Sequence, residues 1–179
     1  MEFTTLTNSH CNETDSIHYF VFKNDSKPQI GIGFIEEFVG FPPEVILLCT
    51  ENGLCLSDDS VSVEDVLLVS VEPFKLPTAE NALLNFTRLS DDLPENGTYF
   101  VLSCEDDYDI DVDDCGRNVG APNGASIQSV HLGLLSKSHD PDDFPLEFNG
   151  FTELSSLSAD ESFRISHYSK FEWPTYSAD

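Results

Sequence analysis

The sequence predicts an all-β protein: a single-domain antiparallel β-sandwich or barrel of about ten short strands with long loops and little helix. Two apolar runs, at residues 45–49 and 66–71, are rich in β-branched side chains and are flanked by prolines. Each run is too short for a typical helix, so both are expected to be strands buried on two faces. Short apolar segments separated by Gly, Pro and Asn continue along the chain, without an internal repeat or a sustained helical period.

The second expected strand contains two glycines, Gly31 and Gly33, which predict a β-bulge or the close approach of another backbone. The third glycine and the helix of a dinucleotide-binding loop do not follow them, which excludes that kind of site. The expected strands are, in chain order, residues 17–23, 29–39, 45–49, 66–71, 85–89, 98–102, 126–135, 146–151 and 162–171.

Turn signals separate these strands. Residues 79–84 are expected to form a short helical turn or the approach to the next strand. The pair Asn96-Gly97 supplies the positive φ angles of tight turns, so a hairpin is expected before the strand at 98–102. Gly and Pro then predict a long loop at residues 117–125, and a charged loop is expected at 136–145.

The length of 179 residues fits one large β domain. Residues 1–16 are polar and are expected to form a flexible N-terminal arm, residues 17–174 the β domain, and residues 175–179 a C-terminal tail. The chain has no apolar run of the length that spans a membrane and no basic-then-apolar leader, so neither a span nor a signal peptide is expected. Met1 is the only methionine, which suggests a domain taken from a longer chain.

Acidic residues dominate the charge: 33 Asp and Glu stand against 8 Lys and Arg, a formal net charge of −25 at pH 7. The basic residues are scattered singly, whereas a nucleic-acid binder needs them clustered to neutralise phosphates. Nucleic acid is therefore excluded as a partner, as are anionic membrane surfaces and membrane insertion. The charge favours solubility and attracts cations or basic proteins.

Four Asn-x-Ser/Thr sequons predict a glycoprotein that is extracellular, secreted or on a virion surface. Their number is in modest excess over chance for this composition. The predicted glycosylation sites are Asn12, Asn24, Asn85 and Asn96.

Five cysteines leave several disulfide pairings open. A three-residue loop with Gly53 in the left-handed region would place Cys49 opposite Cys55, and a bridge between Cys104 and Cys115 would close the acidic loop between them. The alternative is that all five are reduced and buried in a cytosolic protein.

Residues 107–114 alternate acids with apolar residues, which places carboxylates on one face of a strand. Hard oxygen ligands at this density suit Ca²⁺, although the spacing does not fit an EF-hand loop. No other cofactor is expected. The alternatives are a solvated acidic edge that prevents pairing between sheets, or a docking strip for a basic partner. The weak calcium candidates are Asp107, Asp109, Asp111 and Asp113.

Catalytic motifs are missing from the sequence. It contains no G-x-S-x-G turn, no glycine-rich phosphate loop ending in Lys and no H-E-x-x-H zinc motif. His131 and His167 are expected to be strand residues, one buried with a partner and one exposed. The chain is therefore expected not to be an enzyme.

Loop residues are the expected binding surface, because loops rich in Gly, Pro and Asn would connect the strands and aromatic residues concentrate at recognition surfaces. The loop candidates are Asn118, Asn123, His139, Asp140, Phe144, Phe41 and Trp173. His139 beside its acidic neighbours has too few nitrogen or sulfur ligands for zinc.

Three functions fit these observations. The first is a non-enzymatic extracellular or virion-surface recognition domain that binds a protein receptor or glycan, such as a projecting attachment spike of a viral coat protein. The second is a secreted acidic inhibitor or decoy that captures basic proteins such as cytokines. The third is a hydrolase with a site assembled from distant loops. A homodimer is left open.

Overall fold

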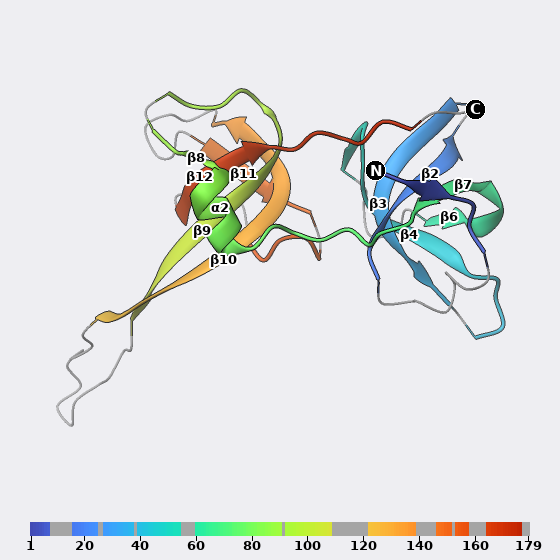
Figure 1. Cartoon of the computed structure of the whole chain (residues 1–179), viewed down its shortest axis with the longest axis horizontal. Helices are drawn as coiled ribbons and strands as arrows, with labels where there is room; N and C mark the ends of the chain where they lie inside the picture. Colours follow the sequence, from blue (N-terminus) through green and yellow to red (C-terminus); the bar gives the residue numbers. More distant parts are fainter. Residues whose placement is uncertain are drawn as a thin grey trace. The chain divides into compact units, whose positions relative to one another are not determined.

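The computed structural model confirms the all-β antiparallel class with little helix. It describes residues 1–7, 16–24, 27–37, 39–54, 60–90, 92–108, 122–138, 146–151, 153–157 and 164–176. The chain divides into two compact units, each with its own antiparallel sheet (Figure 1). Unit 1 comprises Met1–Lys75, Phe151–Glu153 and Glu172–Asp179, and unit 2 comprises Leu76–Gly150 and Leu154–Phe171.

Most of the expected strands are present within a few residues of their predicted bounds. Unit 1 contains β1 (Phe3–Thr4), β2 (His18–Asn24), β3 (Lys27–Glu36), β4 (Glu44–Thr50), β5 (Gly53–Leu54), β6 (Ser60–Ser62), the 3-10 turn η1 (Val63–Asp65) and β7 (Val66–Ser70). Unit 2 contains the helix α2 (Ala79–Asn85), β8 (Thr87–Arg88), β9 (Gly97–Tyr108), β10 (Pro122–Lys137), β11 (Leu146–Gly150) and β12 (Ile165–Lys170).

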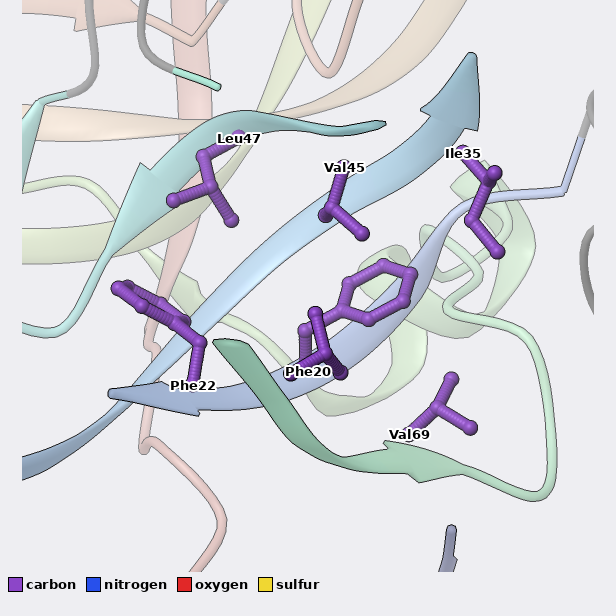
Figure 2. Close-up of a cluster of buried hydrophobic side chains, with 7 residues drawn as sticks. Phe20, Phe22, Ile35, Val45, Leu47 and Val69 are labelled. Carbon is purple, nitrogen blue, oxygen red and sulfur yellow. The ribbon is translucent and has the colours of Figure 1, made fainter. Parts of the chain in front are cut away.

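The sheet of unit 1 bends around one apolar cluster. Its strand order is β1-β7-β2-β3-β4-β5, and β6 also pairs with β4. Because η1 links β6 directly to β7, it joins the β4 side of the sheet to the β7 side. Figure 2 shows Phe20 and Val45 in the middle of the cluster and Phe22 with Leu47 at one end.

The sheet of unit 2 has apolar side chains on both faces, and its strand order is β11-β10-β9-β12-β8. One face carries the cluster around Val101, Leu135 and Phe148. The other face carries Leu102 and Val130, which pack with Ala82 of α2. The helical turn expected at residues 79–84 is confirmed as α2, and the Thr78 side chain caps its start by accepting a hydrogen bond from the Asn81 N–H at 3.2 Å.

Two local predictions in unit 2 are wrong. The strand before Asn96-Gly97 is not the hairpin partner of β9, because β8 pairs with β12 while β9 pairs with β10 and β12. Asn96 instead accepts the N–H of Lys137 through its side-chain oxygen, so long-range pairing overrides the local turn signal. The loop expected at residues 117–125 also ends early, because β10 starts at Pro122.

The two units repeat one strand order. In unit 1, β2, β3 and β4 pair in succession and β7 returns to β2; in unit 2, β9, β10 and β11 do the same and β12 returns to β9. Each returning strand carries one extra residue at its bulge, Leu67 in β7 and Ser166 in β12. The backbone therefore contains a repeat of topology that was not found in the sequence.

Two further contacts follow the same repeat. After the returning strand, the Phe74 N–H donates to the Ile17 carbonyl at 2.6 Å, and the Phe171 N–H donates to the Thr98 carbonyl at 2.9 Å. When Phe22 is aligned with Ser103, the two acceptors Ile17 and Thr98 take equivalent positions, although Ile17 precedes β2 and Thr98 is the second residue of β9.

The glycine prediction is confirmed at Gly33, where a bulge inserts Leu48 into the facing strand β4 and a Cβ atom would collide with the Ile46 carbonyl of β4. Gly133 of β10 repeats this close approach, because a Cβ there would collide with the Asn149 carbonyl of β11. Both positions need glycine for space rather than for an unusual φ angle.

The N-terminal segment contributes to unit 1. Phe3 and Thr4, which belong to the segment predicted as an arm, form β1 and pair with Ser70 and Val69 of β7. Leu6 packs against the apolar cluster. The division into arm, β domain at residues 17–174 and tail stays a prediction.

Candidate functional sites

Unit 1 contains an open pocket of about 490 Å³ at the Phe22 end of its apolar cluster. Three parts of the chain surround it: the hairpin of β2 and β3, the turn between β4 and β5, and β6 with η1. The lining residues are Phe22, Lys23, Asn24, Gln29, Leu47, Thr50, Asn52, Gly53, Ser60, Val61, Ser62 and Asp65.

The floor of the pocket is apolar. Phe22 and Leu47 are both buried, each with 4% of its surface exposed, and they lie together at one end of the cluster in Figure 2. Both belong to strands whose alternate residues fill the core, so the floor is an extension of the fold itself. The half-buried Val61 of β6 completes it.

The rim of the pocket is held by hydrogen bonds within its two hairpins and between the β4–β5 turn and β3. The Asn24 amide donates to Gln29 Oε1 at 3.1 Å across the β2–β3 hairpin, and the Thr50 hydroxyl donates to the Gly53 carbonyl at 3.2 Å. Glu51 fixes the β4–β5 turn against β3, because it donates its N–H to the Ile30 carbonyl at 3.0 Å and accepts the Ile30 N–H through its carboxylate at 3.1 Å.

Two charged side chains of opposite sign line the same pocket. Lys23 at the end of β2 and Asp65 at the end of η1 are both exposed. Exposed charges at a pocket rim act on a ligand at modest strength, since water screens them. The described part of the pocket thus has an apolar floor, a hydrogen-bonding rim and one charge of each sign.

A buried Ser–His pair lies in unit 2. His131 Nε2 is 2.9 Å from Ser103 Oγ, and the Ser156 N–H donates to His131 Nδ1 at 3.2 Å. Because Nδ1 accepts, the neutral ring carries its proton on Nε2 and donates it to the serine. A base that activates serine must accept the hydroxyl proton instead. With both residues about 2% exposed, the geometry is that of a structural hydrogen bond, and His131 is buried with a partner as predicted.

A second polar cluster in unit 2 centres on the bulge residue Ser166. Its hydroxyl donates to the Leu102 carbonyl at 3.2 Å, lies 3.2 Å from Cys104 Sγ and lies 2.9 Å from His167 Nδ1. His167 is half-buried rather than exposed as predicted. These contacts provide hydrogen-bond partners for the side chain of the extra residue that the bulge inserts into β12.

Unit 1 buries a histidine at a different place. His18 Nδ1 is 3.0 Å from the Ser70 carbonyl, and the Ser70 hydroxyl donates to the Glu72 carbonyl at 2.8 Å. The Tyr19 N–H donates to the same hydroxyl oxygen at 3.1 Å. These contacts fasten the end of β7 to β2.

Aromatic side chains cover equivalent positions in the two units. Tyr19 makes edge-to-face contacts with Phe74 and Trp173, and Phe100 contacts Phe86 and Phe171. Burial raises the pKa of the Tyr19 hydroxyl well above its ordinary value, and the nearby Cys49 adds to the effect. Trp173, a predicted binding residue, therefore packs against Tyr19 and is half-buried.

The predicted loop candidates do not gather at the pocket. Phe41 is exposed over 74% of its surface in the segment between β3 and β4, beside the fully exposed Val39. Asn123 lies in β10 rather than in a loop. Asn118, His139, Asp140 and Phe144 lie outside the described residues.

The calcium hypothesis falls mostly outside the described residues. Asp107 belongs to β9, which confirms a strand at that position, while Asp109, Asp111 and Asp113 lie beyond the described part. Among the residues that the structure does describe, no group of three or more His, Cys, Asp and Glu side chains is placed to hold a metal ion.

Three of the four sequon asparagines can be placed. Asn24, Asn85 and Asn96 are all exposed, and Asn12 lies outside the described residues. The Asn85 amide donates to the Asn81 carbonyl at 3.0 Å, whereas Asn96 is engaged through its oxygen. Asn24 stands at the rim of the unit 1 pocket.

The predicted disulfide geometry at Cys49 is wrong. A two-residue turn pairs Thr50 with Gly53, so Cys49 lies opposite Leu54 rather than Cys55. The structure has Cys49 as a buried thiol and Cys104 as a half-buried thiol, and among the described cysteines it shows no disulfide bond. Cys11, Cys55 and Cys115 lie outside the described residues.

Most of the pocket has no signal in the sequence. Phe22, Gln29 and Asp65 are ordinary strand or turn residues when the chain is seen alone, and only the pairing of β2, β3, β4 and β6 brings them together. Polar residues at both ends of short expected strands are the one pattern that could have pointed there.

No helix in the described part of the chain is long and apolar enough to cross a membrane. Comparisons with models of protein families, with curated proteins and with solved structures find no match for this chain.

Proposed function

We propose that this chain is a non-enzymatic recognition domain that binds a protein receptor or glycan at an extracellular or virion surface. The observation that carries the proposal is the open pocket of unit 1. Its volume of about 490 Å³ falls within the range in which small ligands and side chains are bound. Its polar rim supplies directional hydrogen bonds, and its apolar floor supplies contact area.

The pocket suits recognition more than catalysis. Its rim consists largely of amides and hydroxyls that already hold one another in place, which limits the ordering cost of binding. The closest resemblance to catalytic machinery among the described residues, Ser103 with His131, lies in unit 2. That pair is buried and carries its proton on the wrong nitrogen for a base, which weighs against the hydrolase alternative.

Exposed sequons support the extracellular location. Asn85 lies at the end of α2 and Asn96 directly precedes β9, so neither needs to leave a core in order to carry a glycan. The buried Cys49 thiol is compatible with an extracellular and with a cytosolic location, because a fully buried cysteine behaves as a small apolar residue.

The acidic decoy is the second candidate, and the net charge of −25 favours it. Capture by charge alone would spread over the surface and would weaken steeply with salt. Recognition through the pocket would depend on particular residues of unit 1.

A binding screen that includes a variant with a blocked pocket distinguishes these two functions. Wild-type protein is applied to a glycan array and to a panel of receptor ectodomains at 50 mM and 300 mM NaCl, beside Ser60→Trp, which places an indole at the pocket rim. Ser90→Trp, at an exposed serine of unit 2, is the matched control. We expect a hit that persists at high salt and is lost in Ser60→Trp alone. Hits lost equally in both variants, or only salt-sensitive capture of basic proteins, would overturn the proposal.

A further inference from the structure

We propose that the unit 1 pocket takes the cationic side chain of a basic peptide segment, arginine or lysine, with Asp65 as its counter-charge. This inference rests on the proposed recognition function and names the ligand that the pocket would select. Asp65 stands at the end of η1 on the rim, above the floor that Phe22 forms.

The hydrogen bonds of the rim leave oxygen atoms that a ligand rich in donors can use. The Thr50 hydroxyl donates its hydrogen bond to the Gly53 carbonyl, so its oxygen is left as an acceptor. The Asn24 side-chain amide donates one N–H to Gln29 Oε1, and the Asn24 side-chain oxygen is left as an acceptor. A guanidinium group offers five donors and no acceptor, and an ammonium group offers three donors, so both match these oxygens.

The shape of the pocket fits the same kind of side chain. Lys and Arg carry apolar methylene stems below their charged heads. The stem can lie against Phe22 and Leu47 at the floor, while the head reaches the polar rim.

The charge of the whole chain acts in the same direction. A net charge of −25 attracts cations at long range and repels anionic ligands, such as phosphates and acidic glycans. Among the described residues that line the pocket, Lys23 is the single basic side chain, and it opposes a bound cation locally. The proposal therefore assigns opposite effects to Asp65 and Lys23.

The test is an NMR titration of ¹⁵N-labelled full chain with acetyl-Gly-Arg-Gly-amide. We expect the backbone amide signals of Lys23, Thr50, Asn52 and Gly53 to shift in a saturable manner. The comparison probes are acetyl-Gly-Glu-Gly-amide and methyl glucoside, for which we expect no saturable shifts at these amides.

Two charge variants then test which sign of ligand charge the pocket prefers. Asp65→Asn should raise the Kd for the arginine peptide about two- to five-fold and Lys23→Gln should lower it by a similar factor, the range set by exposed ion pairs. Glu80→Gln on α2 removes one charge outside the pocket lining and serves as the matched control, with no change beyond that of the long-range field.

The outcomes divide cleanly. Tighter binding of the glutamate peptide, or equal effects of Asp65→Asn and Glu80→Gln, would overturn the cationic ligand. Saturable binding of methyl glucoside at the same amides would also overturn it while leaving the recognition function standing. If no probe shifts these amides and Ser60→Trp alters no hit in the binding screen, the proposed function fails as well.

Discussion

The two units use the same strand order but fill one equivalent place with opposite chemistry. In unit 1, Phe20 pairs with Gly31 across β2 and β3, and the Phe22 ring extends over that glycine. In unit 2 the register pairs Val101 with His131 across β9 and β10, and Ser103 takes the place that Phe22 has in unit 1. A large side chain over a glycine has thus been exchanged for a small side chain beside a histidine, which keeps the volume filled.

The exchange has a consequence for where each unit can bind. Unit 1 fills the position with an aromatic ring that continues into the floor of an open pocket. Unit 2 fills it with a hydrogen-bonded pair that uses up its own polar atoms. The same backbone therefore gives a binding surface in one unit and an internal polar contact in the other.

The hairpins at this place differ as well. β2 ends at Asn24 and β3 begins at Lys27, so the strands of unit 1 stop at the rim of the pocket. In unit 2, β9 runs on to Tyr108 and β10 begins at Pro122. The two strands therefore extend as a two-stranded ribbon beyond the rest of their sheet (Figure 1). The short β2–β3 hairpin leaves room for a ligand at its end, whereas the long β9–β10 ribbon continues past the equivalent place.

The largest effect is expected at the glycines that the two units share. Gly33→Ala and Gly133→Ala should each lower the free energy of unfolding by about 2–4 kcal/mol, because the added Cβ meets a backbone carbonyl that cannot move aside cheaply. Gly97→Ala is the matched control, since its Cβ would lie 3.4 Å from the Tyr99 ring and should change stability by less than about 0.5 kcal/mol. Urea denaturation measures all three. Equal stabilities for the three variants would contradict the close approach.

The exchanged pair can be converted from one unit to the other. Ser103→Phe alone should crowd His131, and His131→Gly alone should leave a cavity, so each is expected to destabilise the protein. The double variant reproduces the Phe-over-Gly arrangement of unit 1 and should recover about 1–3 kcal/mol relative to the sum of the single effects. A double-mutant cycle by thermal or urea unfolding measures this coupling. Strict additivity would mean that the two units do not fill equivalent space.

Alkaline pH should expose the burial of Tyr19. Below pH 10 the tyrosine is neutral in both states, but above it the unfolded chain loses the proton while the raised pKa keeps the folded tyrosine protonated. Stability should therefore fall as pH rises past about 10, by up to about 1.4 kcal/mol per pH unit for this one proton. Tyr19→Phe should show a shallower fall between pH 9 and pH 11 than wild type in urea melts. An unchanged slope would contradict the assignment.

Tyr99 of unit 2 provides the comparison for that prediction. Its pKa is also raised, by burial first and then by Glu95 and Tyr168. Tyr99→Phe should likewise reduce the alkaline loss, with the same sign as in unit 1.

The smallest stability effect is expected at Phe41, which is exposed over 74% of its surface. Phe41→Ser should change the free energy of unfolding by less than about 0.5 kcal/mol, because little apolar area is lost from a core. If Phe41 contributes to recognition as the sequence suggests, the same variant will weaken binding of any hit from the screen. A loss of stability above 1 kcal/mol in urea denaturation would show instead that Phe41 packs against the fold.

Strand positions were predictable from the sequence because their alternation and β-branched content are local properties. The apolar runs at residues 45–49 and 66–71 are β4 and β7, and Gly33 lies opposite a bulge of β4 and close to its backbone, as the sequence predicts. The Asn96-Gly97 hairpin failed because a turn signal states that the chain can bend but not which strand pairs next.

The candidate site was far less predictable. The sequence predicts Phe41 and Trp173 as binding residues because both are aromatic and lie beside prolines, but Phe41 is exposed while Trp173 packs on Tyr19. Asp65 and Gln29 lie far apart in the sequence and had no motif to join them. Their meeting depends on β6 pairing with β4 while β3 pairs with β2, which no single segment encodes.

By itself the sequence determined the all-β class, the net negative charge and the need for glycine at a close backbone approach. Composition and local periodicity carry that information directly, because they follow from neighbours along the chain. Only the tertiary structure decided that the strand order occurs twice, that Ser103 accepts a hydrogen bond from His131, and that Phe22 forms the floor of a pocket beside Asp65. These features arise from strand register, and register is fixed by contacts between distant residues.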